Sequence, residues 1–350
     1  MKADNDILSL LEAKTAQVAK EMQRAVILQP GALGDCILTL PLVRLMKEGL
    51  DLGGVDLVGH ADYVGILPER SCVDGIRSID SAELHKLFIE PARFDLADRD
   101  PLIHMFADYS WIVTFLGEPG SDFEQNLIFT ANCSRSAEIV ALPLKPPGGV
   151  QRHVADFYAE QFSHQSGLSF DQPSTDPKGR LIRITEADRD RGVDLLEQAD
   201  IDLSKRLVVI HPGSGGLKKC WHLDNFLTIA ERLRSSELEV VFLLGPAEMD
   251  RLRPSEKVSI HSAAKCMAHL SLAHVIAVLS CADGFVGNDS GVTHLAAGIG
   301  LRTVALFGPT NPTVYKPLGP SVTVLQDDEG GFAEQSSHRL QKAVLDALTF

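Results

Sequence analysis

Short runs of apolar residues alternate with amphipathic segments along the chain. The runs have the length and composition of buried strands, and the segments between them repeat their apolar residues with a helical period. Two such helical segments are "LDNFLTIAERLRSS" and "AHVIAVLSCA". This alternation predicts α/β architecture with parallel sheets. The predicted strands are residues 25–29, 55–59, 75–79, 111–116 and 138–142 in the first half, and 206–212, 239–245, 284–288 and 303–308 in the second.

A stretch rich in Pro, Asp, Ser and Gly, "LSFDQPSTDPKGR" (168–180), lies between the two series of strands and predicts a linker. At 350 residues the chain is longer than one hydrophobic core usually supports. We therefore expect two Rossmann-like domains that face each other across a cleft, residues 1–170 and 171–350. In this prediction residues 1–23 are a helical extension, and the last helix is able to pack back on the first domain.

Charge and composition narrow the class of partner. The net charge of −14 disfavours a nucleic-acid binder, which needs a basic surface, and also broad adsorption to anionic lipid. The net charge does not exclude an anionic substrate, because a few cationic side chains in a cleft determine the local electrostatic potential. No run approaches the roughly 18 apolar residues of a membrane span, and the charged N-terminus does not resemble a signal peptide, so we expect a cytoplasmic protein. The six scattered cysteines argue against a structural zinc site and a disulfide framework.

The first predicted strand ends in a glycine-rich corner, "QPGALGDCILTLP". Gly31 and Gly34 let the backbone turn tightly, and Asp35 stands where a helix begins. The corner matches neither G-x-G-x-x-G nor the Walker pattern. Two interpretations of Asp35 remain open: an N-cap of the helix, or a general base held at the cleft and kept ionised by the helix dipole.

Two corners of the second half combine flexible backbone with charge. In "HPGSGGLKKCWHLDNF", Ser214 begins a glycine-rich loop and Lys219 follows it. Small residues and a lysine suit a diphosphate, whereas the alternative is a pair of solvated surface lysines. In "LLGPAEMD", Glu248 follows a strand, where a carboxylate can accept hydrogen bonds from a ribose. Its alternative is a solvated acid at a helix start.

A fourth corner, "DGFVGNDSGVTHL", leads from a strand into an apolar helix. Asp289 and Ser290 are good helix caps, but a helix start with Gly291 also points free N–H groups at an anion. His294 lies one turn into the helix, as a ligand contact or as a packed, hydrogen-bonded histidine. The three corners of the second half share one end of a presumed sheet, which describes a pocket for a nucleotide diphosphate. The first corner adds an acid, an arrangement suited to group transfer from a nucleotide-activated donor.

Together the corners resemble glycosyltransferase family 9, the ADP-heptose:lipopolysaccharide heptosyltransferases and their relatives. The resemblance rests on "GALGDCILTLP", "HPGSGGLKKCW" and "GNDSGVTHLAAGIGLRTVALFGPTNP", in that order. It implies a GT-B fold and an inverting enzyme with no metal or other cofactor. It further implies an ADP-linked heptose as donor and a lipopolysaccharide-core or related glycan as acceptor, with at most peripheral contact with the inner membrane through the acceptor.

The resemblance also implies roles for individual residues. It assigns Asp35 as catalytic base and the loop of Gly31 and Gly34 to the acceptor side. Contacts to the donor nucleotide and its diphosphate are implied for Ser214, Lys219, Glu248, Asp289, Ser290, Gly291 and His294.

Two positions depart from the heptosyltransferase pattern. Many of these enzymes have a lysine where this chain has Gln29, and often a histidine where it has Leu38. Both departures weaken the assignment of heptose more than that of glycosyl transfer. Two alternatives remain open at this point: a nucleotide-sugar epimerase of the same architecture, and a sugar-nucleotide-binding protein without activity.

Overall fold

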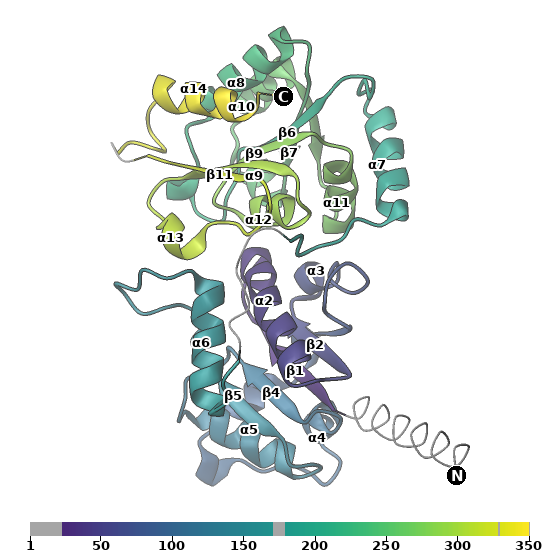
Figure 1. Ribbon diagram of the computed structural model, residues 1–350, viewed down its shortest axis with the longest axis vertical. Coiled ribbons are helices and arrows are strands. Elements are labelled where there is room, and N and C mark those ends of the chain that lie inside the picture. Colours follow the sequence, from purple (N-terminus) through teal and green to yellow (C-terminus); the bar gives the residue numbers. More distant parts are fainter. Residues whose placement is uncertain (1–22, 171–178, 328–329, 350) are drawn as a thin grey trace, which may run out of the picture. The chain divides into compact units, whose positions relative to one another are not determined.

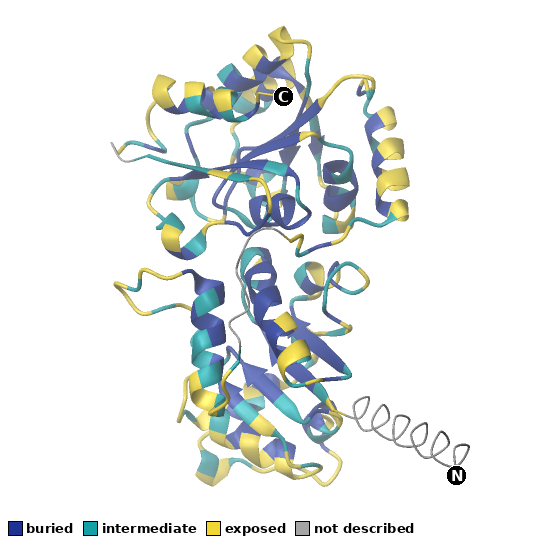
Figure 2. Ribbon diagram, viewed as in Figure 1, coloured by how far each residue is buried: buried dark blue, intermediate teal, exposed yellow. Residues whose placement is uncertain are grey.

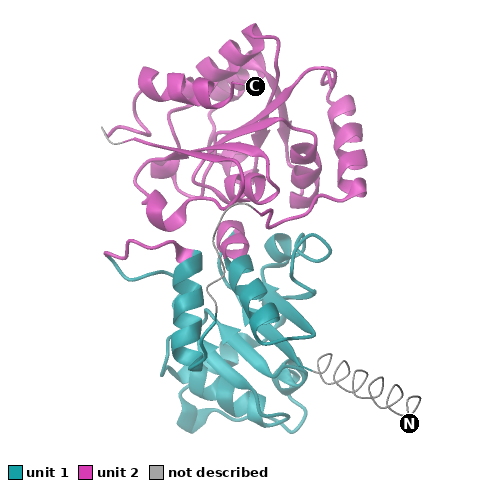
Figure 3. Cartoon of the chain, viewed as in Figure 1, with its two compact units in different colours: residues 1–32, 39–148, 155–173 teal, residues 33–38, 149–154, 174–350 magenta. Residues whose placement is uncertain are grey.

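The computed structural model describes residues 23–170, 179–327 and 330–349, which form two α/β units (Figures 1 and 3). Unit 1 comprises residues 1–32, 39–148 and 155–173, and unit 2 comprises residues 33–38, 149–154 and 174–350. The predicted extension at 1–23 falls almost wholly outside the described residues, as does most of the predicted linker.

Unit 1 is built on a five-stranded parallel sheet with the order β3-β2-β1-β4-β5. In the central strand the apolar run "AVIL" (25–28) is fully buried, as expected for a parallel sheet covered on both faces. The strands are β1 (Arg24–Leu28), β2 (Gly54–Gly59), β3 (Gly75–Ser78), β4 (Trp111–Thr114) and β5 (Glu138–Ala141). The helices are α2 (Leu33–Gly49), α3 (Ala61–Val64), α4 (Pro101–Phe106), α5 (Asp122–Asn132) and α6 (Val154–Ser166), with 3-10 turns η1 (Ile79–Ser81), η2 (Leu84–Phe88) and η3 (Pro91–Arg93). The first residues of α2 (33–38) and of α6 (154) are grouped with unit 2.

Unit 2 has a six-stranded parallel sheet with the order β11-β10-β9-β6-β7-β8. Its strands are β6 (Leu207–His211), β7 (Glu239–Leu244), β8 (Lys265–Ala268), β9 (Gly284–Asn288), β10 (Arg302–Phe307) and β11 (Val322–Gln326). Its helical elements are α7 (Glu186–Gln198), η4 (Leu217–Lys219), α8 (Leu223–Ser235), α9 (Pro246–Arg251), α10 (Pro254–Ala263), α11 (Leu272–Ser280), α12 (Gly291–Gly298), α13 (Pro312–Tyr315) and α14 (His338–Ala347).

Alternate residues of the unit 2 strands point to opposite faces, and one face packs against α8, α10 and α14. Figure 2 shows the strands of this sheet mostly buried. Leu340, Val344 and Leu348 of the last helical segment belong to this core. The apolar face of α14 thus packs in unit 2 and not on the first domain, the packing that the sequence also allows.

All nine predicted strands form, with ends that differ by at most two residues. Two strands were not predicted, β8 and β11, and both lie at the edges of the unit 2 sheet. Edge strands are half-exposed and carry polar residues, so "KCMA" and "VTVLQ" lack the continuous apolar run of a buried strand.

Candidate functional site

The order of strands in unit 2 reverses direction between β6 and β9, which are neighbours in the sheet. From β6 the chain continues outward to β7 and β8, and from β9 it continues the other way to β10 and β11. Ligands of open α/β sheets bind at the carboxyl ends of the strands at such a reversal. His211 of β6 pairs with Gly287 of β9, so the loops that follow these two strands start side by side.

One fully buried side chain, Asn288, joins the two loops. Its Oδ1 atom accepts a hydrogen bond from the backbone N–H of Trp221 at 2.9 Å, and its Nδ2 atom donates to the carbonyl of Pro212 at 2.7 Å. Ser214 adds a third link, because its hydroxyl donates to the carbonyl of Asp289 at 2.6 Å. The loop after β6 is therefore fixed against the start of α12. Sequence reasoning missed Asn288, although it directly precedes the predicted site residues.

Asp289 is the electrostatic centre of this corner. Its carboxylate is 7% exposed and receives the Lys219 ammonium group at 2.7 Å on Oδ2. The Nε2 atom of His294 lies 3.8 Å from Oδ1, which is too long for a direct hydrogen bond. Burial by itself raises the pKa of the Asp289 carboxyl, but the His294 imidazole and the Lys219 ammonium outweigh burial and lower the pKa to about 2.

This depressed pKa predicts a pH-dependent contribution to stability. The ordinary value of 3.8 applies to the unfolded chain, so the stabilisation is complete above about pH 4 and is lost as pH falls toward 2. Lowering the pKa from 3.8 to about 2 corresponds to roughly 2–3 kcal/mol. The difference in unfolding free energy between wild type and Asp289→Asn is expected to narrow by roughly 1–2 kcal/mol between about pH 5 and pH 2.5. Denaturant titrations at the two pH values measure it, and a constant difference would refute the ion-pair account.

In the fourth corner, the helix cap and the ion pair are made by different residues. Ser290 is the N-cap of α12 and accepts a hydrogen bond from the Thr293 N–H. Capping thus explains Ser290, but the Asp289 side chain is engaged with Lys219 instead. Gly291 is the first residue of α12. His294 is buried, and its Nδ1 atom has no hydrogen-bond partner among the described residues.

Glu248 lies at the start of α9, after β7. It is buried rather than solvated, and its Oε2 atom accepts a hydrogen bond from the Gly245 N–H at 2.8 Å. It lies directly against Gly213, where a side chain would overlap its carboxylate. Glu248 and Gly213 both line a cavity of about 530 Å³. The alternative of a solvated acid at this helix start is therefore wrong.

Arg251 also lines this cavity, and sequence reasoning did not single it out. Its guanidinium donates to the carbonyl of Ser214 at 2.9 Å and to that of Gly215 at 3.2 Å. These bonds hold the flexible glycine-rich loop from the side of α9. The nearby sequence offers no signal for this role, which depends on the packing of α9 beside the loop.

The β1–α2 corner contains Gly31, Gly34 and Asp35. Asp35 is half-buried in the first turn of α2, two residues after the helix begins at Leu33, so it is not the N-cap. Gln29, which replaces a lysine of the heptosyltransferase pattern, is fully buried. Its amide donates to the Thr39 hydroxyl at 2.8 Å and accepts from the Gly31 N–H at 2.8 Å, so it braces the loop.

The structure therefore brings together Ser214, Lys219, Asp289, Ser290, Gly291 and His294 at the β6–β9 corners of unit 2, with Glu248 beside the loop after β6. Within the described ranges no group of three or more His, Cys, Asp or Glu side chains is arranged to hold a metal ion. None of the helices in those ranges has the length and apolar character to span a membrane. None of the six cysteines, all described, forms a disulfide.

Several known proteins are similar to this chain in sequence. The model of glycosyltransferase family 9 (heptosyltransferase) matches residues 144–344. Lipopolysaccharide heptosyltransferase 3 of Escherichia coli K12 is 28% identical over 312 residues, 81% of this chain and 82% of the relative. Lipopolysaccharide heptosyltransferase 1 of Pseudomonas aeruginosa is 32% identical over 145 residues, and this alignment spans only 41% of each chain.

Two solved structures share the fold over most of their length. A family 9 glycosyl transferase from Veillonella parvula has a TM-score of 0.70 at 17% identity, covering 93% of this chain and 95% of that one. The E. coli ADP-heptose lipopolysaccharide heptosyltransferase II has a TM-score of 0.67 at 15% identity, covering 93% and 98%. These similarities show that the fold is GT-B. Because the family model matches more than half of the sequence, the chain belongs to glycosyltransferase family 9.

Proposed function

We propose that the protein transfers a heptose from an ADP-linked donor to a lipopolysaccharide-core or related glycan acceptor, with inversion at the anomeric carbon and without a metal ion. The observation that carries the proposal is the Lys219–Asp289 ion pair beside the start of α12, at the strand reversal of unit 2. The heptosyltransferase names of the relatives support the sugar. An E. coli heptosyltransferase solved with ADP supports the nucleotide, at a TM-score of 0.60. Family membership favours transfer over the epimerase alternative.

On the donor side, the task is to stabilise the negative charge of the departing diphosphate. The Lys219 side chain is 41% exposed, so its ammonium group is accessible to a ligand while Asp289 holds it in place. The free N–H groups at the start of α12 and the backbone of the Ser214 loop add donors that need no reorganisation during the reaction. We propose that these groups together supply the charge stabilisation that a metal ion provides in other transferases.

On the acceptor side, we assign the proton transfer to Asp35. An acceptor hydroxyl oxygen attacks the anomeric carbon from the face opposite the diphosphate, and the C–O bond to the diphosphate breaks. The hydroxyl proton passes to the Asp35 carboxylate, and the bonding electrons leave with ADP. A single displacement of this kind inverts the anomeric configuration. We place the reaction at the cytoplasmic face of the inner membrane, with membrane contact only through the acceptor.

The donor part of the proposal is tested by nucleotide-induced stabilisation. ADP is expected to raise the melting temperature more than GDP or UDP, and at a hundredfold excess over Kd to add about 2.7 kcal/mol of stability. The same shift is expected in EDTA, because the proposed charge stabilisation comes from Lys219 and backbone N–H groups. A shift that requires magnesium would contradict metal independence, and a larger shift with UDP would contradict the ADP-linked donor.

A further inference from the structure

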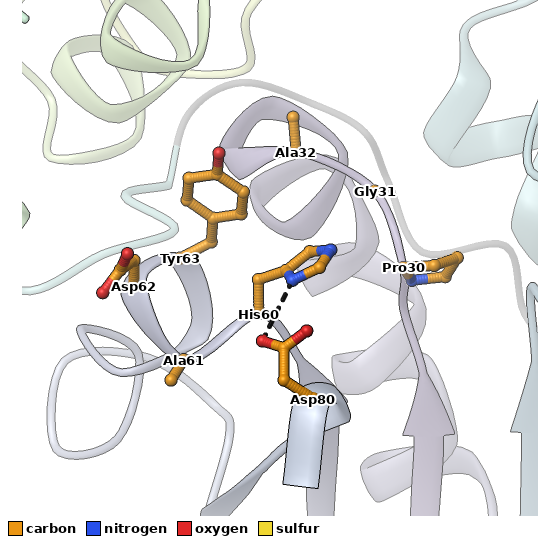
Figure 4. Close-up of a pocket in the computed structure, with 8 residues that line it drawn as sticks. All are labelled: Pro30, Gly31, Ala32, His60, Ala61, Asp62, Tyr63 and Asp80. Carbon is orange, nitrogen blue, oxygen red and sulfur yellow. Dashed lines mark hydrogen bonds and ion pairs between the residues drawn. The ribbon is translucent and has the colours of Figure 1, made fainter. Parts of the chain in front are cut away.

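A separate pocket lies in unit 1 at the carboxyl ends of three neighbouring strands (Figure 4). It has a volume of about 470 Å³. Pro30 and Gly31 follow β1, His60 and Tyr63 follow β2, and Asp80 follows β3. The carboxyl ends of parallel strands are where open α/β sheets bind ligands. The pocket adjoins the glycine-rich loop of the β1–α2 corner, which contributes Gly31.

A histidine and an aspartate form the centre of this pocket. The Nδ1 atom of His60 lies 3.3 Å from Oδ2 of Asp80, and the His60 ring meets the Tyr63 ring edge-on at 5.9 Å. Figure 4 shows His60 between Tyr63 and Pro30, with its second ring nitrogen on the side of the Gly31 loop. When Nδ1–H donates to Asp80, a neutral His60 presents Nε2 as an acceptor. Carboxylate oxygens and this nitrogen can accept hydrogen bonds from hydroxyl groups, while Tyr63 adds an aromatic surface.

The charges that line the pocket are negative. Asp62 and Asp80 are both exposed, and no lysine or arginine is among the residues that line it. The lysine expected at position 29 in heptosyltransferases is here Gln29, whose amide is engaged with Thr39 and Gly31. A phosphate or carboxylate in this pocket would meet like charges without a cation, which is unfavourable.

We propose that this pocket binds the acceptor sugar and selects an uncharged, hydroxyl-rich ring over one that carries phosphate or carboxylate. The inference rests on the proposed function, since it takes the acceptor to be a glycan. It assigns His60 and Asp80 to the recognition of sugar hydroxyls and makes the negative charge of Asp62 and Asp80 the cause of selectivity.

A binding measurement on the full chain tests the proposal independently of transfer. The probes are methyl heptopyranoside and its monophosphate, and the signal is the imidazole NMR resonances of His60, assigned with His60→Gln. The uncharged ring is expected to shift these resonances, with the monophosphate binding at least about tenfold more weakly, equivalent to about 1.4 kcal/mol. The proposal is overturned if the monophosphate binds as tightly, or if the uncharged ring leaves the His60 resonances unchanged.

Reversing one charge within the pocket provides a second test. Asp80→Lys is expected to reverse the preference toward the monophosphate, whereas Asp98→Lys should not, because Asp98 is an exposed aspartate that does not line the pocket. Equal effects of the two variants would overturn the proposal, since a long-range change in net charge would then explain both. ADP-induced stabilisation of the two variants should equal that of wild type, which shows that each remains folded.

The proposed function and the pocket assignment can be refuted separately. If the uncharged ring binds as expected but no sugar is transferred from ADP-heptose, the pocket assignment is supported and the proposed function fails. If heptose is transferred while the phosphorylated ring binds better, the proposed function is supported and the selectivity inference is overturned.

Discussion

Replacing Asp35 with asparagine is expected to slow glycosyl transfer by roughly 10²–10⁴-fold, the usual contribution of a general base. Asparagine keeps the shape of the side chain but cannot take the acceptor proton. Asp35 lies in the first turn of α2, where loss of a negative charge costs only about 0.3–1 kcal/mol of helix stability. The variant should therefore fold, bind ADP as wild type does, and fail to transfer. Transfer rate and ADP affinity are measured on the same purified sample.

A matched control separates catalysis from helix electrostatics. Asp122 is an exposed acid in the first turn of α5, so Asp122→Asn removes a comparable charge from another helix of the chain. Its transfer rate is expected to stay within about twofold of wild type, because surface substitutions of this kind have small effects. Transfer by Asp35→Asn within tenfold of wild type would mean that another group accepts the proton. Loss of ADP affinity in Asp35→Asn would argue for a structural role.

Replacing Lys219 with methionine is expected to weaken ADP binding by about 1.5–3 kcal/mol, or roughly ten- to hundredfold, because a hydrogen bond to charged phosphate is lost. Stability should also fall, since the buried Asp289 carboxylate loses its ammonium partner. We expect a stability loss of roughly 1–3 kcal/mol. Isothermal titration with ADP and denaturant unfolding measure the two effects.

Lys218 provides the matched control for this variant. It is the adjacent exposed lysine, so Lys218→Met removes the same charge from the same 3-10 turn. ADP affinity and stability are both expected to change little. If Lys219→Met lowers stability but binds ADP as tightly as wild type, Lys219 only supports Asp289 and the proposed diphosphate contact is wrong.

The strands could be predicted because a parallel sheet covered on both faces demands continuous apolar runs. Segments such as "RLVVIH" and "EVVFLL" satisfy that demand locally, and all nine strands predicted in this way form. The unit 2 edge strands β8 and β11 were not predicted, because half-exposed edges do not require such runs. The unit 1 edge strands β3 and β5 were predicted nonetheless, from "GIRSI" and "EIVAL". The packing of α14 within unit 2 likewise depends on tertiary contacts that no local pattern encodes.

The residues of the candidate site were also only partly predictable from the sequence. Lys219, Asp289 and Ser290 could be found because charged and hydroxyl side chains beside glycines at the ends of strands have the chemistry that suits an anion. Asn288 and Arg251 escaped notice because their roles consist of hydrogen bonds to carbonyls distant in sequence. Local sequence does not distinguish the cap from the ion-pair partner, since either Asp289 or Ser290 can cap a helix; in the structure Ser290 caps α12 and Asp289 pairs with Lys219.

The proposed metal-independent, inverting heptose transfer is tested most directly by a single-turnover reaction of the purified chain with ADP-heptose in EDTA. The acceptor is a lipopolysaccharide core that ends in an unphosphorylated sugar, and the product is analysed by mass spectrometry and by NMR of the new anomeric centre. We expect one added heptose, release of ADP and an anomeric configuration opposite to that of the donor. Retention of configuration, or conversion of ADP-heptose without any transfer to the acceptor, would rule out inverting heptose transfer by this chain.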